Sequence, residues 1–346
     1  MSRHYSITGM LLFAAAAVAC APPPTAAQEI IVFGGPEEAG AWLQSENWWG
    51  ETKRGEQLSA PYALITGISP RWPETAKSLP VADKKEAFYR FLLPLALHAN
   101  VMVENRRERL IQGDEDLAAG KPLSKEQLEG LRRGAILLRI MNETDAAELS
   151  NESPERLREV IAESLYRLDV IPPGLVLGQA AYESGYGTSR FAVEGNALFG
   201  QWTFGGEGLV PEQQRKELGD HRIASFEWPF DSVRGYYLNL SSHPAYEGFR
   251  KLRARLRAEG KALTSLALAD GLKSYSERGQ EYVDELKGII RVNKLDIADG
   301  ATLRDEPMRL LVSVESPEAA GKMRTEIEAM RSSGEFDEII ARMRLE

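Results

Sequence analysis

Hydrophobic residues recur along most of the chain at the three- and four-residue spacing that places them on one face of an α-helix. The longest stretch of this kind begins near Asp83, and its apolar face runs through Phe88, Leu92 and Leu95. Pro94 lies inside it, and a kink is expected there because proline has no N–H to donate and crowds the preceding turn. The pattern predicts a long helix that packs one face against a core.

Start signals predict further helices after this one. Ser124 followed by Gln127 has the spacing of a capping box, and the helix that it opens should extend to about Met141. Ser153-Pro154 predicts the start of the next helix, because serine is a favoured cap and proline is favoured at the first helical position. Pro172-Pro173 ends that helix and begins another, which is almost entirely apolar.

Three segments lack this helical pattern. Residues 29–79 are expected to form an irregular N-terminal extension, with a short strand in the apolar run at 30–33. Residues 200–228 are rich in glycine and aromatic residues, which predicts a loop or a small β-hairpin lobe. Residues 296–346 are expected to form a separate C-terminal tail with a short strand and helices. The whole pattern predicts a mainly α fold, in which residues 80–150 are a helical N-terminal part.

Residues 1–28 have the features of an export signal. Basic residues precede an apolar run, Met10 to Ala19, that is too short to cross a bilayer, and small residues and prolines follow it. The chain's one cysteine, Cys20, stands where a bacterial lipoprotein has its lipidated cysteine. We therefore expect a periplasmic protein, anchored to the outer membrane through Cys20 and touching the membrane only there. The alternative is ordinary cleavage, after Ala19 or Ala27, with Cys20 removed.

Charge and composition exclude several classes of function. The 346-residue chain has a formal net charge of −9, which disfavours a nucleic-acid partner, since phosphate backbones attract basic proteins. One cysteine cannot form a disulfide within the chain. His98, His221 and His243 have no spacing that would chelate a metal. We expect neither a metal nor another cofactor.

The strongest candidate for chemistry is Glu183, near the end of the apolar helix that begins at Pro172-Pro173. Gln179 and Glu183 are the strongly polar side chains of this helix before Ser184, and their four-residue spacing puts them on one helix face. Apolar surroundings raise the pKa of a carboxyl group, because desolvation disfavours its charged form. A carboxyl group of this kind can serve as the general acid in glycoside cleavage. The simpler alternative is a structural glutamate bonded to the backbone or to Arg190.

The same region resembles the glucosaminidase family of bacterial cell-wall hydrolases, and within it the Bax-like branch. The resemblance rests on two segments: Gly-Gln-Ala-Ala-Tyr-Glu-Ser-Gly-Tyr-Gly at 178–187, and Asn-Ala-Leu-Phe-Gly at 196–200. Tyr186 stands where the family commonly has tryptophan, and Ala197 stands where it commonly has a second asparagine. Both differences leave the family's chemistry available.

The resemblance implies a catalytic domain at 151–295 with a lysozyme-like α+β fold. Glu183 falls on the family's general acid. The side chains expected to contact the substrate are Gln179, Ser184, Tyr186, Asn196, Phe199 and Trp202. The aromatic members of this set have flat faces on which sugar rings can stack.

A second signature of the family, Tyr-Ala-Thr-Asp-Pro-x-Tyr, has a divergent counterpart at 275–282. Its first tyrosine, Tyr275, is expected to take part in catalysis by positioning substrate or water, whereas Tyr282 is interpreted as packing. The family often has a second catalytic glutamate in its β-hairpin lobe, and Glu207 is the best match for it. Glu194 and Glu227 are alternatives, and the substrate's own N-acetyl group could replace a protein carboxylate.

The reaction that the resemblance implies is hydrolysis of the β-1,4 bond between N-acetylglucosamine and N-acetylmuramic acid. The expected partner is therefore the glycan strand of peptidoglycan. Two other functions remain open. A lytic transglycosylase also uses a glutamate followed by a serine on a helix, although its usual Gly-Leu-Met-Gln motif is replaced here by Leu-Phe-Gly-Gln at 198–201. The second open function is that of a non-catalytic protein that binds the cell wall or acts as a scaffold.

Overall fold

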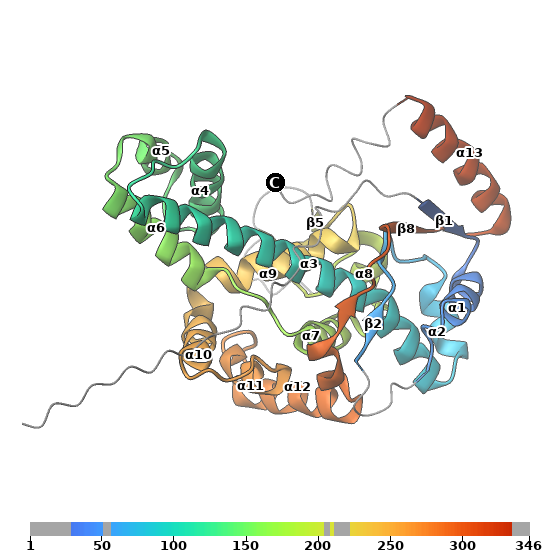
Figure 1. The fold of residues 1–346 in the computed structure, drawn as a ribbon. Coiled ribbons are helices and arrows are strands. Elements are labelled where there is room, and N and C mark those ends of the chain that lie inside the picture. Colours follow the sequence, from blue (N-terminus) through green and yellow to red (C-terminus); the bar gives the residue numbers. More distant parts are fainter. Residues whose placement is uncertain (1–28, 51–56, 204–207, 211–221, 334–346) are drawn as a thin grey trace, which may run out of the picture.

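The computed structural model describes residues 29–50, 57–203, 208–210 and 222–333 (Figure 1). The α-helices are α1 (Pro36–Ser45), α2 (Trp72–Ser78), α3 (Val81–Ala118), α4 (Lys125–Leu137), α5 (Glu143–Ala147), α6 (Pro154–Arg167), α7 (Pro173–Ser184), α8 (Arg190–Gly195), α9 (Pro229–Ser242), α10 (Glu247–Ala258), α11 (Ser265–Leu268), α12 (Gln280–Val292) and α13 (Pro317–Ser333). Short 3₁₀ helices are η1 (Glu148–Asn151), η3 (Pro244–Tyr246), η4 (Ala269–Leu272) and η5 (Leu295–Gly300). The strands are β1 (Glu29–Phe33), β2 (Ser59–Ala60), β3 (Ala63–Ile65), β4 (Trp202–Thr203), β5 (Gly208–Leu209), β6 (Arg222–Ala224), β7 (Thr302–Leu303) and β8 (Arg309–Ser313). The predicted mainly α, lysozyme-like α+β fold class is confirmed.

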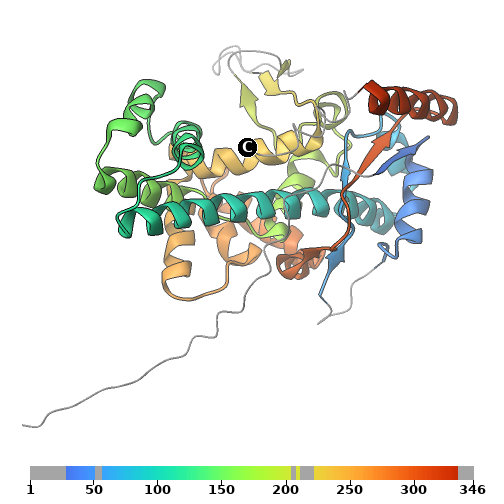
Figure 2. The ribbon, with the colours of Figure 1, turned by 45° about the horizontal axis from the view of Figure 1, so that its top comes forward.

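The long predicted helix is α3, which runs through the middle of the molecule and packs against α6, α7 and α9 (Figure 2). It continues through Pro94. Pro94 has no N–H for the carbonyl of Arg90, four residues earlier, and the indole N–H of buried Trp48 donates to that carbonyl instead, at 3.1 Å. The Arg90 guanidinium also lies 4.3 Å from the centre of the Trp48 ring. Trp48 therefore replaces the hydrogen bond that the proline removes.

α7 lies at the centre of the fold, in contact with α3, α11, α12 and η5. Almost all of its residues are buried. Gly174 allows the close approach of η5, because a Cβ at this position would lie 2.3 Å from the carbonyl oxygen of Leu295. The backbone N–H of Gly174 donates to the carboxylate of Asp299 at 3.0 Å, which holds the same contact. The helix that carries Glu183 is thus fixed on several sides.

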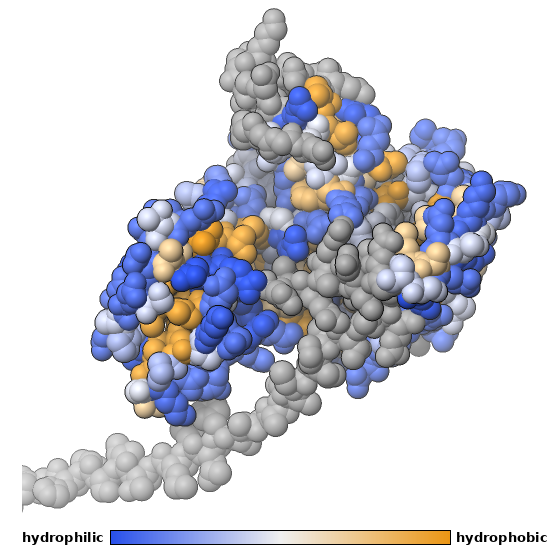
Figure 3. All heavy atoms as spheres, turned by 90° about the horizontal axis from the view of Figure 1, so that it is seen from above, coloured by the Kyte–Doolittle hydropathy of each residue, from blue (hydrophilic) through white to orange (hydrophobic). Residues whose placement is uncertain are grey.

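A second and smaller core lies between α4, α5, α6 and the end of α3. Leu131 and Ile161 are buried in it. Ser124 and Gln127 form the predicted capping box, and Ser153 caps α6 as its sequence indicates. Seen from above, this lobe lies at the left of the molecule, and its surface is mostly hydrophilic with apolar patches (Figure 3).

β1, β8 and β3 form a parallel sheet with β8 in the middle, and it joins the two ends of the described chain. On one face, Phe33 and Leu311 pack with Trp42 of α1 and Phe91 of α3. On the other face, Val32 packs against α13. Both faces of the sheet are covered, as is usual for parallel sheets.

This sheet differs from the expected division of the chain. The sequence predicts an irregular extension at 29–79 and a separate tail at 296–346, whereas the structure places β1 and β3 of the first on either side of β8 of the second. β2 and β7 also pair in parallel between these two regions. A parallel pair is joined through a long connection, so a pairing of such distant segments leaves no local pattern in the sequence.

β4, β6 and β5 form a small antiparallel sheet in the region where the sequence predicts a β-hairpin lobe. Glu207 lies outside the described residues. The predicted export signal, Cys20 and residues 334–346 also lie outside them. Within the described ranges, no helix is long and apolar enough to span a membrane.

Replacing Trp48 should show what its bond to the Arg90 carbonyl contributes. We expect Trp48→Phe to lower the free energy of unfolding by about 1–3 kcal/mol, because a buried carbonyl loses its donor. Urea unfolding followed by circular dichroism measures this. In a Pro94→Ala background the restored helix N–H can bond to the Arg90 carbonyl, so Trp48→Phe should cost at least about 1 kcal/mol less there. An equal cost in both backgrounds would contradict the assignment.

Candidate active site

Glu183 lies in the last turn of α7, where the buried helix reaches the surface. The helix is apolar apart from Gln179 and Glu183 until its final residue, as its sequence indicates. Gln179 is fully buried, whereas Glu183 is half-buried. On this one helix face, the amide of Gln179 thus lies inside the core and the acid of Glu183 lies nearer the surface.

A chain of hydrogen bonds leads from the core to this carboxyl group. The Tyr282 hydroxyl, on α12, donates to Oε1 of Glu183 at 2.9 Å. The same hydroxyl accepts a hydrogen bond from Nε2 of Gln179 at 2.9 Å, and the Tyr236 hydroxyl, on α9, donates to Oε1 of Gln179. Tyr236 is 0% exposed and Tyr282 is 1% exposed. Three helices therefore hold one carboxylate oxygen in a fixed position.

Burial raises the pKa of Glu183 above its ordinary value, because the charged form loses solvation. The hydrogen bond from Tyr282 opposes this effect, since it stabilises the carboxylate. Among the described residues, no charged group contributes to the shift. Arg190, the alternative partner in the sequence, pairs instead with Glu194 at 3.1 Å. Glu183 is thus a carboxyl group that keeps its proton to a higher pH than an ordinary glutamate.

The backbone beside the second oxygen of Glu183 belongs to Gly200. A Cβ added at Gly200 would lie 3.5 Å from Oε2, and Gly200 has a φ of +59°, which favours glycine. The Tyr275 hydroxyl donates to the carbonyl oxygen of Phe199 at 2.9 Å and so holds this segment. The charge of Glu183 adds to the effect of burial in raising the pKa of Tyr275, which shows that the two side chains are neighbours.

Aromatic rings form the support behind this segment. Tyr275 stacks on Tyr282 with ring centres 5.7 Å apart and an angle of 9° between the planes. Phe199 stacks on Tyr236 with ring centres 4.2 Å apart. Phe199 is 1% exposed, so its ring packs in the core, while the backbone beside it passes the acid.

Ser184 closes the end of α7. It is fully buried, its hydroxyl donates to the carbonyl of Ala180 at 2.6 Å, and it accepts from the N–H of Gly187 at 2.8 Å. Gly185, Tyr186 and Gly187 all have positive φ angles, 59°, 62° and 75°. A tyrosine in this conformation is uncommon and is held by its surroundings.

The surroundings of Tyr186 come from the N-terminal helices. The indole N–H of Trp72 donates to the Tyr186 carbonyl at 2.9 Å. The Tyr186 ring contacts Phe88 and Tyr89 of α3 edge-on, with ring centres 5.8 and 5.9 Å away. These contacts tie the turn after Glu183 to α2 and α3, in the N-terminal part of the chain.

The two remaining predicted contact residues lie on the segment after α8. The side chain of Asn196 accepts from the N–H of Ile68 at 3.3 Å and donates to the carbonyls of Phe226 and Glu227 at 3.1 and 2.9 Å. Asn196 thus joins three loops. Trp202 is 49% exposed on β4.

The structure brings together Glu183, Gln179, Ser184, Phe199 and Tyr275. The polar atoms of Gln179 and Ser184 are used inside the protein, so in this structure both residues position the acid and the turn after it. A direct contact of any predicted residue with substrate stays a prediction. In the described ranges, no group of three His, Cys, Asp or Glu side chains could hold a metal ion.

Sequence reasoning missed two members of this network. The sequence indicates only a packing role for Tyr282, and that interpretation is incomplete because its hydroxyl donates a hydrogen bond to Glu183. Tyr236 lies on the buried face of α9 among apolar residues, so the sequence pattern indicates only packing for it. The available signal was the hydroxyl itself, because a buried tyrosine oxygen usually needs a hydrogen-bond partner.

Comparisons with known proteins assign the residues around Glu183 to a known family. Residues 160–295 match the glucosaminidase family, described as mannosyl-glycoprotein endo-beta-N-acetylglucosaminidase. The match contains α7, α9 and α12, which supply the whole network around Glu183. No solved structure matches the chain significantly.

A curated relative extends the similarity beyond the matched domain. The chain is 38% identical over 238 residues to "Protein bax" of Escherichia coli (strain K12), which covers 68% of this chain and 80% of that protein. The family implies a glycoside hydrolase-type enzyme. The match over 160–295, together with identity along most of the chain, shows that this protein belongs to the glucosaminidase family and is Bax-like.

Proposed function

We propose that the chain is an exported endo-β-N-acetylglucosaminidase that cleaves β-1,4 bonds after N-acetylglucosamine in peptidoglycan. The observation that carries the proposal is the half-buried carboxyl group of Glu183, which has a raised pKa and one oxygen fixed by Tyr282. A glycosidase needs an acid that is protonated when the substrate arrives and that stays in one orientation. Membership of the glucosaminidase family supports the substrate class.

In the proposed reaction Glu183 gives its proton to the glycosidic oxygen as the bond from that oxygen to the sugar's C1 breaks. Tyr282 occupies Oε1, so Oε2, beside the backbone of Gly200, is the oxygen that carries the proton. Water then adds to C1, and the proton that it releases restores the acid. Tyr275 positions the substrate or the water through its own contact with the Phe199–Gly200 segment.

The positive charge that develops at C1 needs a negative partner. Glu207 or the amide of the substrate would stabilise it. Glu194 is engaged by Arg190, which makes it a weaker candidate than Glu207. A carboxylate about 5–5.5 Å from Glu183 would give a covalent intermediate and retention, whereas about 6.5–9.5 Å leaves room for water and gives inversion.

The proposed location follows from residues 1–28. We propose export to the periplasm and a lipid anchor at Cys20, on the basis of the signal pattern in the sequence. Mass spectrometry of the N-terminus of the mature protein from bacterial membranes tests this. A diacylglyceryl group on Cys20 is the expected result, and a mature N-terminus beyond Cys20 would contradict it.

Glu183→Gln tests the proposed acid. The amide can still accept from Tyr282 but cannot give up a proton in the same way, so we expect turnover to fall by about 10²–10⁴-fold with the fold retained. The measurement is mass spectrometry of peptidoglycan digested by the mature protein and then reduced with borohydride. Reducible N-acetylglucosamine ends should appear with the unaltered protein and with Glu74→Gln, whose side chain is 85% exposed. Anhydro-muramic ends would indicate a transglycosylase, and no new ends from folded, wall-binding protein would indicate a scaffold.

Tyr282→Phe tests the hydrogen bond that holds the acid. This bond lowers the pKa of Glu183, so its loss should raise that pKa further and keep the acid protonated to a higher pH. The alkaline limb of the pH profile of kcat/KM should therefore move upward, while turnover falls because the carboxyl group is held less firmly. Tyr166→Phe removes a hydroxyl bonded to Glu247 and is the matched control. A downward move, or the same move in the control, would contradict this role of Tyr282.

A further inference from the structure

A cavity of about 380 Å³ lies at the carboxyl ends of the three parallel strands. Phe33 ends β1, Ile65 ends β3 and Ser313 ends β8, and all three residues line it. In open sheets with parallel strands, ligands bind in the crevice beyond these strand ends. Neither Glu183 nor Tyr282 lines the cavity, so it is distinct from the candidate active site.

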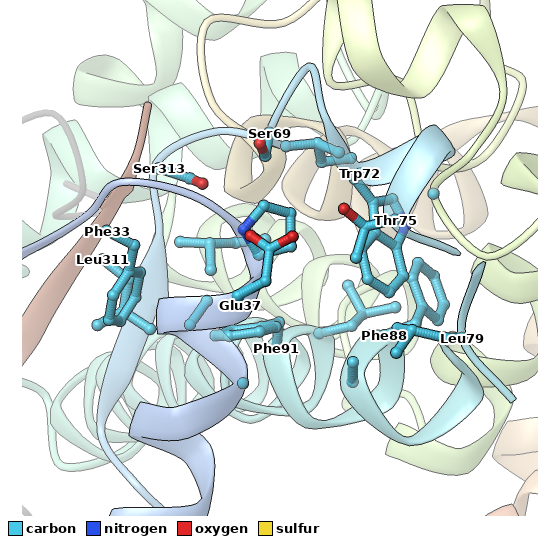
Figure 4. Close-up of a pocket in the computed structure, with 18 of the residues that line it drawn as sticks. Phe33, Glu37, Ser69, Trp72, Thr75, Leu79, Phe88, Phe91, Leu311 and Ser313 are labelled. Atoms are coloured by element: carbon cyan, nitrogen blue, oxygen red, sulfur yellow. The ribbon is translucent and has the colours of Figure 1, made fainter. Parts of the chain in front are cut away.

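The walls of the cavity are mainly apolar and rich in aromatic rings. Figure 4 shows Phe33, Phe88, Phe91 and Trp72 around it, contributed by β1, α3 and α2. Trp49 also lines it. Its volume lies within the range of about 300–1,000 Å³ that is typical of small-molecule sites. Few polar side chains line the cavity, so the hydroxyl groups of a sugar would find few hydrogen-bond partners there, whereas an apolar ring system would fit its walls.

The charged side chains among the described residues that line the cavity are Glu37 and Asp83, both carboxylates. Figure 4 shows the Glu37 carboxylate directed over the cavity. Arg71 neutralises part of this charge, since it pairs with Glu37 at 3.1 Å, but Arg71 does not line the cavity. The opening therefore favours a ligand with a positive charge or hydrogen-bond donors.

The N-terminus of α1 faces the same opening and would by itself favour an anion. Its partial charge is equivalent to about half an elementary charge. The carboxylate of Glu38 lies next to this helix end, since it accepts a hydrogen bond from the N–H of Gly34, just before the helix, at 2.8 Å. Glu37 and Glu38, in the first turn of α1, place negative charge beside this helix end and so offset its partial positive charge before any ligand binds.

We propose that this cavity is a binding site for a small aromatic amine. The ring system lies among Phe33, Trp72, Phe88 and Phe91, and the amine lies at the opening beside the Glu37 carboxylate. A cation close to aromatic faces gains a further attraction from their π-electrons. The cavity lining includes Gly187, on the turn after Glu183, but not Glu183, so the ligand would lie next to that turn rather than at the candidate acid.

The chain offers a substitution that fills the cavity without removing any wall residue. Gly40 of α1 lines the cavity, and a Cβ added there would meet nothing within 4 Å. Gly40→Phe therefore places a ring in the cavity, and phenylalanine favours a helix more than glycine does. Gly248→Phe is the matched control, because Gly248 is an exposed glycine of α10 with equally open space and lies outside the cavity.

Isothermal titration calorimetry on the full mature chain at pH 7 tests the proposal with 1-naphthylmethylamine and 1-naphthoate, which share a ring system and differ in charge. We expect saturable binding of the amine, at least about tenfold tighter than binding of the carboxylate, and a loss of at least about tenfold in affinity in Gly40→Phe but not in Gly248→Phe. Glu37→Gln should weaken amine binding and strengthen naphthoate binding.

Three results would overturn the proposal: no saturable binding of the amine to folded protein, unchanged binding in Gly40→Phe, or naphthoate binding as tightly as the amine. Thermal unfolding of each variant without ligand shows whether it is folded. Because the readout is binding rather than cleavage, its outcome is independent of whether the protein hydrolyses peptidoglycan.

Discussion

The burial of a carboxyl group at the end of an apolar helix is the constraint on which the rest of the site depends. Desolvation favours the protonated form of Glu183, but an acid that is free to rotate would gain little from this. The hydroxyl of Tyr282 fixes one oxygen, Gln179 fixes that hydroxyl, and Tyr236 fixes Gln179. The buried amide of Gln179 and the hydroxyls of Tyr236 and Tyr282 all have hydrogen-bond partners in this network, so they can lie in the core without the cost of an unpaired buried group.

The position of α7 depends in turn on the two ends of the described chain. α3 supports α7 from one side, and Trp48 completes the hydrogen bonds of α3 at Pro94. β8 lies between β1 and β3, which holds the C-terminal region against the segment that contains Trp48. The turn after Glu183 is bonded to Trp72, in the same N-terminal region. Residues outside the matched glucosaminidase domain therefore help to hold the loop beside its candidate acid.

Local features of this fold could be predicted from the sequence, whereas distant pairings could not. The capping box at Ser124, the cap at Ser153 and the apolar helix ending near Glu183 depend on neighbouring residues, and the structure has all three. The parallel sheet and the bond from Tyr282 to Glu183 join segments far apart in the chain, and neither leaves a periodic signal. The effect of Pro94 on α3 could not be predicted from the helix sequence alone, since it depends on Trp48, a residue outside the helix. Glu207 as second carboxylate stays a prediction, because it lies outside the described residues.

The most direct test of this account is the pKa of Glu183, measured by NMR titration of protein labelled with ¹³C at the glutamate side-chain carboxyl carbon. The resonance that disappears in Glu183→Gln identifies the group. The account predicts that this resonance titrates clearly above the ordinary glutamate value of about 4.3. Burial also raises the pKa of Glu104, so the assignment by Glu183→Gln is what separates the two groups. A Glu183 that titrates at or below that value would contradict it, because such a carboxyl group would be ionised when a substrate arrived and could not act as the proposed acid.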